Sequence, residues 1–227
     1  MKLAPGPIPP RMTVQDAVYQ RLRDALMAGS FDPGQVLTIA SLAERFGTSN
    51  MPVREALRRL GAEKALELAQ NGSARVPAVT VARLEDLARA RVAVEGLAAE
   101  LGAPRLTARD ITGLEAIVAE QRSIGRDRDV YDLMAKNYDF HFTIYRASGS
   151  EVLLQLIETL WLRFGPYMRL LQTSVEPLIR SGEIEASGQH GAVLAALKDG
   201  NFGRVRASIV HDITWTADIL QRFCPDS

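Results

Sequence analysis

The chain is poor in cysteine and aromatic residues, and it lacks long hydrophobic runs. Its 227 residues include a single cysteine, Cys224, so no disulfide can form within the chain and nothing indicates secretion. No stretch approaches the roughly 18 apolar residues of a membrane-spanning helix. The N-terminus also lacks the apolar segment and cleavage site of a signal peptide. By exclusion, we expect a cytoplasmic protein without membrane association.

Net charge is absent as well, because 27 basic residues balance 27 acidic ones. The charges are unevenly divided: residues 1–76 carry 10 basic and 7 acidic side chains, whereas residues 77–227 carry 17 and 20. This mild asymmetry is consistent with a small basic DNA-binding domain joined to a larger domain that does not contact DNA. An aromatic content of 6%, with abundant Leu, Ala, Arg and Glu, predicts a mainly α-helical protein.

Residues 37–60, LTIASLAERFGTSNMPVREALRRL, have the pattern of two short helices joined by a tight turn. One apolar stripe at helical spacing consists of Ile39, Leu42, Ala43 and Phe46. Gly47 is suited to end this helix, and Pro52 falls in the first turn of the next. The residues left facing outward there are Ser49, Asn50, Met51 and Arg54, followed by Arg58. The pattern predicts a helix-turn-helix whose second helix enters the major groove.

The flanking segments complete a winged helix over residues 13–77. Four prolines and a glycine make residues 1–12 a disordered lead-in, and an amphipathic helix is expected over residues 13–28. After the helix-turn-helix, a β-capable stretch at 65–69, a turn containing Asn71 and Gly72, and a return at 74–76 predict a hairpin.

The remaining residues, 78–227, are helical in pattern throughout. Amphipathic segments lie near residues 81–101, 111–118, 131–145, 152–171, 185–198 and 202–223. No strand signal or internal repeat interrupts them. We therefore expect a second domain that is a bundle of six or seven helices.

All three histidines of the chain, His141, His190 and His211, lie in predicted helices of this bundle. Asn137 precedes His141 by four residues, so the two side chains share one helical face. Convergence of these helices would place three imidazoles and an amide oxygen around one divalent metal ion. Histidines so far apart in sequence are more often ordinary surface or core residues, and spacing leaves both interpretations open.

Arg91 also has two interpretations. With Glu95 four residues later it can form an ordinary helix salt bridge, or it can be held in the bundle to bind a carboxylate ligand. The chain lacks GxSxG, HExxH, a phosphate-binding glycine loop and a Cys–His pair. An enzyme is therefore the less expected class, and a metal-dependent enzyme built on the bundle remains an alternative, as does an effector-free DNA-binding protein.

Three motifs resemble the GntR family of bacterial winged-helix regulators. They are GxxxPGxxL at residues 29–37, LAxxxG at 42–47 and PVREALRRL at 52–60. The second domain resembles the all-helical, FCD-type ligand-binding domain of the FadR-like subgroup, through Arg91-x-x-x-Glu95, Phe140-His141 and His190-x-x-x-Leu194. The resemblance covers residues 13–222. It implies a homodimer that binds a roughly palindromic operator and responds to a small carboxylate effector held by the helical domain, which would also dimerise.

The resemblance also implies functional residues. DNA contacts would come from Ser49, Asn50, Met51 and Arg54 and, at the wing, from Asn71 and Gly72. Asn50 stands where most relatives have arginine. Because asparagine pairs with adenine and arginine with guanine, this difference favours adenine at the corresponding operator position.

For the metal, expected to be Zn, Ni or Mn, the implied ligands are Asn137, His141 and His190. The family spacing for the last ligand falls on Asp212, whereas the histidine is His211, so either residue is a candidate. Arg91 would bind the effector carboxylate. The resulting expectation is a repressor of a catabolic or transport operon that a small carboxylate releases from DNA, not an enzyme.

Overall fold

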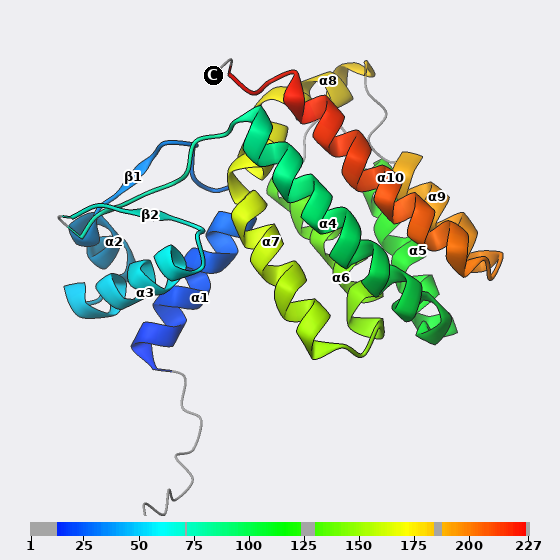
Figure 1. The fold of residues 1–227 in the computed structure, drawn as a ribbon, viewed down its shortest axis with the longest axis horizontal. Helices are drawn as coiled ribbons and strands as arrows, with labels where there is room; N and C mark the ends of the chain where they lie inside the picture. The colour runs from blue at the N-terminus through cyan, green and yellow to red at the C-terminus, as the bar shows by residue number, and fades with distance from the viewer. Residues whose placement is uncertain (1–12, 71, 124–129, 184–187, 226–227) are drawn as a thin grey trace, which may run out of the picture.

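The structure is a computed structural model that describes residues 13–70, 72–123, 130–183 and 188–225. A small winged helix occupies one side of the molecule, and a larger helical bundle occupies the other (Figure 1). The expected mainly α fold with this division is confirmed. The predicted lead-in at residues 1–12 and the wing residue Asn71 lie outside the described residues.

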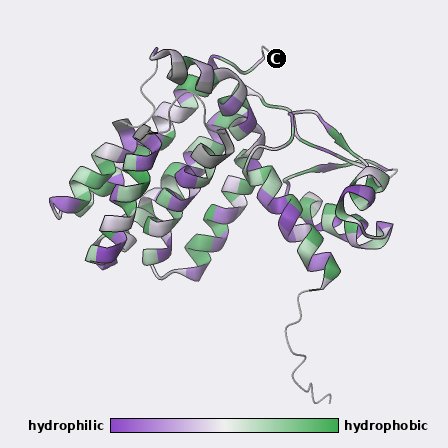
Figure 2. Cartoon of the chain, turned by 180° about the vertical axis from the view of Figure 1, so that it is seen from behind, coloured by the Kyte–Doolittle hydropathy of each residue, from purple (hydrophilic) through white to green (hydrophobic). Residues whose placement is uncertain are grey.

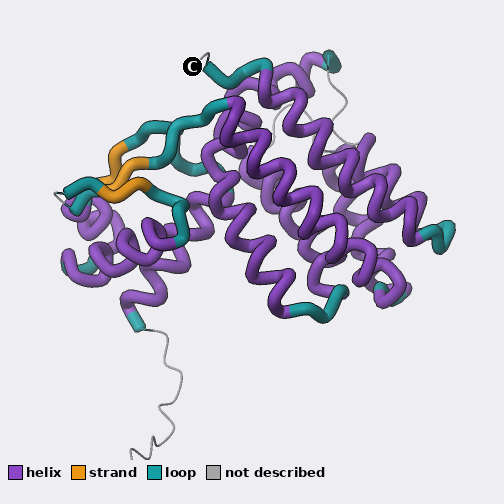
Figure 3. Tube along the Cα trace, viewed as in Figure 1, coloured by secondary structure: helices purple, strands orange, loops and turns teal. Residues whose placement is uncertain are grey.

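The N-terminal part combines three helices with a three-stranded antiparallel sheet. Its elements are α1 (Val14–Met27), β1 (Val36–Leu37), α2 (Ile39–Phe46), α3 (Asn50–Ala62), β2 (Glu67–Leu68) and β3 (Ala74–Arg75). The strand order is β1-β3-β2, and Arg75 of β3 lies opposite Val36 on one side and Glu67 on the other. These short strands form the wing (Figure 3). The sequence predicted β2 and β3, but β1 was missed because a two-residue strand has no periodicity.

Side-chain caps begin the first two helices. The hydroxyl oxygens of Thr13 and Thr38 accept hydrogen bonds from backbone amides in the first turns of α1 and α2. Gly47 ends α2 with φ of 60°, a left-handed conformation that glycine adopts without strain. Helix α1 packs against α3 of the helix-turn-helix, and Leu22 of α1 and Leu60 of α3 are fully buried.

The second part contains seven α-helices among its described residues, in agreement with the expected six or seven. They are α4 (Val81–Gly102), α5 (Ala108–Ser123), α6 (Val130–Ala147), α7 (Glu151–Leu170), α8 (Glu176–Ser181), α9 (Gly188–Lys198) and α10 (Phe202–Gln221). A 3-10 turn at Ala103–Arg105 and a π-helical segment at Leu171–Val175 were not predicted. Polar and apolar residues are interspersed along these helices (Figure 2), as expected for amphipathic helices.

Helix α4 lies at the centre of the bundle and packs against α6, α7 and α10 (Figure 1). Near its end, Gly102 comes so close to the carbonyl oxygen of Ile144 on α6 that a Cβ atom would clash with it. No helix in the described part of the chain is long and apolar enough to cross a membrane.

The two parts of the molecule meet where α1 packs against α7. Gly165 of α7 lies against the backbone of Leu26, and Gly29 after α1 lies against the backbone amide of Arg169. The Gln172 side chain, in the π-helical segment, donates a 2.6 Å hydrogen bond to the carbonyl oxygen of Ala28. Backbone thus touches backbone at this junction, where a side chain would hold the two parts apart.

A tyrosine ties the connecting segment to the same helix. The Tyr167 hydroxyl accepts a hydrogen bond from the Thr80 amide at 3.1 Å and donates one to the Thr80 carbonyl at 2.8 Å. Thr80 is also the N-cap of α4, since its hydroxyl oxygen accepts a hydrogen bond from the amide of Arg83. The start of α4 is therefore anchored to α7 next to the α1 contact.

The glycine contact predicts a specific loss of stability. Gly165→Ala should lower the free energy of unfolding by about 1–3 kcal/mol, because its methyl group has no space against Leu26. Gly113→Ala is the matched change in α5, where nothing lies within 4 Å of the new Cβ atom. It should raise stability by up to about 1 kcal/mol through helix propensity. Urea unfolding of both variants measures the difference, and equal effects would contradict the close packing at the junction.

Candidate functional site

The start of α3 is an exposed surface that can read DNA. Asn50, Met51 and Arg54 are all exposed, and 64% of Met51 is accessible, which is unusual for a large apolar side chain. Ser49 is exposed at the N-cap, where its side chain makes no capping hydrogen bond. These side chains are therefore available to a partner, which is the arrangement that a recognition helix requires.

The two arginines of α3 that the sequence predicts to face DNA, Arg54 and Arg58, differ in their hydrogen bonding. Arg58 donates to both carboxylate oxygens of Glu55, at 2.9 and 2.7 Å. Arg54 makes no ion pair or hydrogen bond with the described residues, and a Cβ atom on Gly72 would lie 3.4 Å from its guanidinium. The wing turn, with φ of 81° at Gly72, thus lies beside the recognition helix. Arg75 on β3 is a further exposed cation on the wing that the sequence analysis did not single out.

A second group of polar side chains lies inside the bundle. His141 of α6, His190 of α9 and Asp212 of α10 have potential ligand atoms within 4.8 Å of one another. The Nε2 atom of His141 is 3.3 Å from Nε2 of His190 and 3.1 Å from Oδ2 of Asp212. Three helices that are far apart in sequence thus bring two imidazoles and one carboxylate together.

Outer hydrogen bonds determine which nitrogen of His141 faces this group. The buried Glu95 carboxylate accepts a 2.7 Å hydrogen bond from the Tyr145 hydroxyl, so that hydroxyl cannot donate its proton elsewhere. The 3.0 Å contact between Tyr145 and Nδ1 of His141 therefore requires Nδ1 to carry the proton. A neutral His141 then presents the lone pair of Nε2 to His190 and Asp212.

The same reasoning applies to His190. Its Nδ1 atom lies 2.8 Å from Oε1 of Gln121, an oxygen that can only accept, so Nδ1 donates and Nε2 keeps its lone pair. Two imidazole lone pairs and a carboxylate oxygen consequently face one another in a buried space. Such a group of acceptors is favourable only around a proton or a cation, and outer hydrogen bonds of this kind typically orient metal-binding histidines.

In the absence of a cation, a proton on Nε2 of His141 is the alternative that makes this buried group of acceptors favourable. Burial, reinforced by the positive charge of a protonated His141, lowers the pKa of His190 from 6.5 to about 4, which keeps its imidazole neutral near pH 7. Burial by itself would raise the pKa of Asp212, but the hydrogen bond and the charge that a proton on Nε2 of His141 provides outweigh burial. The pKa of Asp212 is therefore below its usual value, and its carboxylate is ionised.

The structure places the two candidates for the last ligand differently. His211 is exposed on α10 and lies outside the group, whereas the alternative, Asp212, belongs to it. One residue along a helix rotates the side chain by about 100°, so only one of the two can face the bundle interior. Asn137 is half-buried one turn before His141, and its amide makes no hydrogen bond with the described residues.

Arg91 is buried rather than solvated, with an exposed fraction of 6%. Its Nε atom donates to Glu95 at 2.6 Å and one terminal nitrogen donates at 3.3 Å, while the other makes no hydrogen bond with the described residues. The guanidinium also lies over the rings of Phe164 and Trp161, 4.5 and 5.1 Å from their centroids. Burial opposes its charge, but Glu95 outweighs burial and raises the pKa of Arg91.

Sequence reasoning missed most of the residues that support this group. Tyr145, Trp161 and Gln121 carry no motif, and only the tertiary fold shows that they hydrogen-bond Glu95 or His190. Glu95 was singled out as a partner of Arg91, but not as a fully buried acceptor shared by three helices. The Arg91-x-x-x-Glu95 spacing was the available signal, and it could not distinguish a buried pair from an exposed one.

Both parts of the chain match known protein families. Residues 14–76 match the family described as bacterial regulatory proteins, gntR family, and residues 86–214 match the FCD domain. The transcriptional regulator McbR of Escherichia coli is 33% identical over 181 residues, which cover 80% of each protein. A probable D-xylose utilization operon transcriptional repressor from Paenarthrobacter nicotinovorans is 26% identical and covers 89% of this chain and 87% of its own length.

A solved structure of E. coli McbR/YncC has a similar fold, with a TM-score of 0.85 at 28% identity, over 94% of this chain and 99% of that one. A winged helix with an exposed recognition helix, joined to a helical bundle, defines a DNA-binding transcription regulator. The chain belongs to the GntR family and carries an FCD domain as its second part. The relatives and the matched fold are those of regulators rather than enzymes.

Glu95 offers a test of this buried network. Glu95→Gln should lower the free energy of unfolding by about 3–5 kcal/mol, because it leaves the buried Arg91 cation without a counter-charge. Glu100→Gln is the matched change on the same helix, at an exposed pair with Arg206. It should change stability by less than about 1 kcal/mol. Chemical unfolding distinguishes the two, and a similar small effect for both would show that Arg91 does not depend on Glu95.

Proposed function

We propose that this protein is a ligand-responsive repressor of a catabolic or transport operon, and that a small carboxylate bound in the FCD domain releases it from DNA. The observation that carries this proposal is the convergence of three lone-pair donors, on His141, His190 and Asp212, together with the buried cation Arg91, whose charge acts on Asp212. A site that combines potential metal ligands with a fixed positive charge suits an anionic ligand that binds to both the metal ion and the cationic side chain.

The residues fit a first-row divalent ion such as Zn, Ni or Mn. Imidazole nitrogens and a carboxylate oxygen are ligands that these ions accept, and Asn137 offers an amide oxygen from the turn before His141. When bound, the ion would supply a Lewis acid for a carboxylate oxygen of the effector. Tyr145 and Gln121 would then keep both imidazoles in the correct tautomer.

Arg91 is the residue proposed to bind the effector carboxylate directly. Its terminal nitrogen that does not contact Glu95 retains hydrogen-bonding capacity, and its charge acts on Asp212 across the group. Removal of water around this buried guanidinium strengthens its attraction for an anion. Glu95 orients it and partly neutralises it, so a ligand carboxylate would complete its coordination.

Helix α7 is the proposed connection between the effector site and the DNA-binding part. Trp161 donates a 3.1 Å hydrogen bond to Glu95, and Gly165, one turn later on the same helix, contacts α1 at Leu26. An effector that alters the Arg91 and Glu95 pair would therefore bias the position of α7 against α1. Such a bias shifts the population of domain arrangements that fit the operator.

We further propose that the protein acts on DNA as a homodimer. A pair of recognition helices related by two-fold symmetry would read two half-sites about one helical turn apart. Exposed apolar side chains in the bundle, among them Leu97 and Leu101 of α4, offer a surface for the second copy. The repressor name of the Paenarthrobacter nicotinovorans relative supports repression rather than activation.

The metal proposal is tested by two neighbouring residues of α10. Asp212→Asn should weaken Zn binding by at least about 100-fold, because it removes a charged ligand, and even outer-shell changes cost 10–100-fold. His211→Asn removes an imidazole that is exposed outside the group and should leave the affinity unchanged. Competition with a chromophoric chelator measures both affinities in protein first stripped with EDTA.

The opposite pattern, with binding lost in the His211 variant and retained in the Asp212 variant, would overturn the proposed ligand set. Retention in both variants would show that the metal binds elsewhere. Because neither residue lies in the winged helix, operator binding in the absence of effector should persist in both variants, which confirms that they fold.

The DNA-reading surface is tested with Arg54. Arg54→Ala should weaken binding to an operator selected from random DNA by about 1–3 kcal/mol if the side chain contacts a base edge. Arg109→Ala removes another exposed charge, on α5 in the other part of the molecule, and should have no effect. Fluorescence anisotropy over a series of salt concentrations measures the affinities and the number of phosphate contacts.

The selected DNA also reports the oligomeric state. Two inverted half-sites are expected for a homodimer, whereas a single unrepeated site would argue against it. Equal affinities of the Arg54 and Arg109 variants would exclude Arg54 from the recognition surface without affecting the metal proposal.

A further inference from the structure

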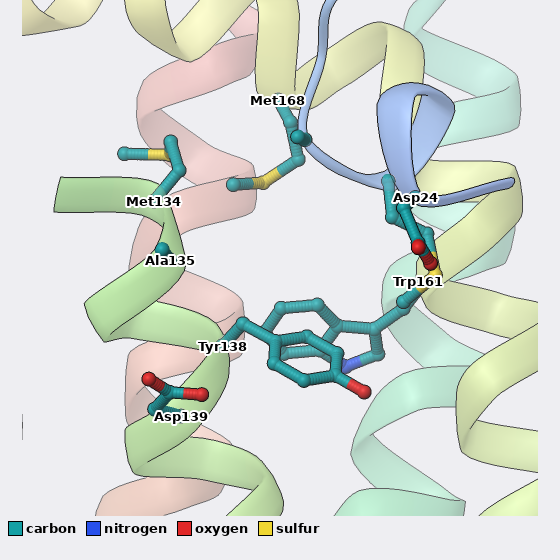
Figure 4. A pocket seen from close by; sticks show the side chains of 9 residues that line it. Asp24, Met134, Ala135, Tyr138, Asp139, Trp161 and Met168 are labelled. Carbon is teal, nitrogen blue, oxygen red and sulfur yellow. The ribbon is translucent and has the colours of Figure 1, made fainter. Parts of the chain in front are cut away.

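A pocket of about 380 Å³ lies at the junction of the two parts of the molecule, separate from the His141 group. Its walls come from α1 on one side and from α6 and α7 on the other. Figure 4 shows Met134, Ala135 and Tyr138 of α6 facing Asp24 of α1, with Trp161 of α7 between them. The volume falls in the range of small-molecule sites.

The walls of this junction pocket are apolar and polarisable. Met134 and Met168 are buried methionines whose flexible thioethers adapt to ligands of different shape, and Met27 of α1 adds a third. Tyr138 and Trp161 meet edge to face, with ring centroids 5.8 Å apart. They form an aromatic corner that can receive an aryl group.

The charged residues lining the junction pocket are all acidic. Asp24 and Asp139 contribute carboxylates from opposite sides, and no lysine or arginine is among its lining residues. The Asp139 carboxylate makes no hydrogen bond or ion pair with the described residues. Of the nearby cations, Arg23 is paired with Glu158, and Arg146 donates a 3.4 Å hydrogen bond to the Tyr138 hydroxyl and lies over the Phe142 ring. An anion would be repelled by the two carboxylates, whereas a cation would be attracted by both of them.

We propose that the junction pocket binds a lipophilic organic cation, with an aryl group against Tyr138 and Trp161 and an ammonium group near Asp139 and Asp24. This site differs from the proposed effector site in location and in the charge of its ligand. Because its walls belong to both parts of the chain, its occupant contacts α1 and α7 at the same time. The two sites share Trp161, whose Nε1 atom donates to Glu95 while its side chain lines the pocket.

The experiment uses the fluorescence of Trp161 in the full chain. Trp215→Phe removes the other of the two tryptophans. This protein is titrated with 4-phenylbutylamine and with 4-phenylbutyrate, which have similar shapes and opposite charges. EDTA is present throughout, so that the carboxylate cannot bind a metal at the other site. The amine should give a saturable change with a dissociation constant on the order of 1 mM, as is usual for so small a ligand, and the carboxylate should bind at least about tenfold more weakly.

Two further variants locate the site. Ala135→Phe fills the junction pocket from an exposed position on α6 and should abolish the saturable change. Asp139→Asn should weaken the amine about threefold by removing one carboxylate, whereas Asp86→Asn, an exposed aspartate on α4, should not. Near-ultraviolet circular dichroism checks that each variant keeps its packing.

The proposal is overturned if the amine causes no saturable change, if the carboxylate binds equally well and loses that binding in the Ala135→Phe variant, or if Ala135→Phe binds the amine normally. None of these results depends on the metal site, because Asp212→Asn protein should bind the amine like the wild type. Failure of the metal proposal and failure of this one are therefore separately observable.

Discussion

The arrangement of the bundle depends on the hydrogen bonds that the Glu95 carboxylate accepts. It is fully buried, and it accepts hydrogen bonds from Arg91 on its own helix, Tyr145 on α6 and Trp161 on α7. An ionised carboxylate inside a protein is stable only with such a set of donors. Because Glu95 accepts the hydroxyl proton of Tyr145, it also determines the tautomer of His141. The structural ion pair of Arg91 and Glu95 and the candidate metal centre therefore form a single network.

The same network reaches the DNA-binding part through one helix. Trp161 and Gly165 lie one turn apart on α7; the first contacts Glu95, and the second packs against the backbone of α1. Close-packed backbones transmit displacement because they leave no space to absorb it. The π-helical segment that follows α7 supplies Gln172 to the same contact, as irregular helical turns often do at functional positions.

The sequence predicted the residues whose environment is local. The helix-turn-helix and the glycine that ends its first helix depend on neighbours within a few positions, and both are present. Where a residue's partner lies on another element, prediction was incomplete. His211 and Asp212 illustrate the limit, because adjacent residues face opposite environments and only helix packing decides which one is inside.

By itself, the sequence determined the class of the protein: periodicity and turn chemistry are local properties, and they specify a winged helix followed by a helical bundle. Tertiary structure alone decided that Arg91 is buried, that Tyr145 and Gln121 orient two imidazoles, and that a pocket opens between α1 and α6. The physical reason is that burial, tautomer and cavity shape depend on contacts between residues tens of positions apart. Such contacts exist only after the helices have packed.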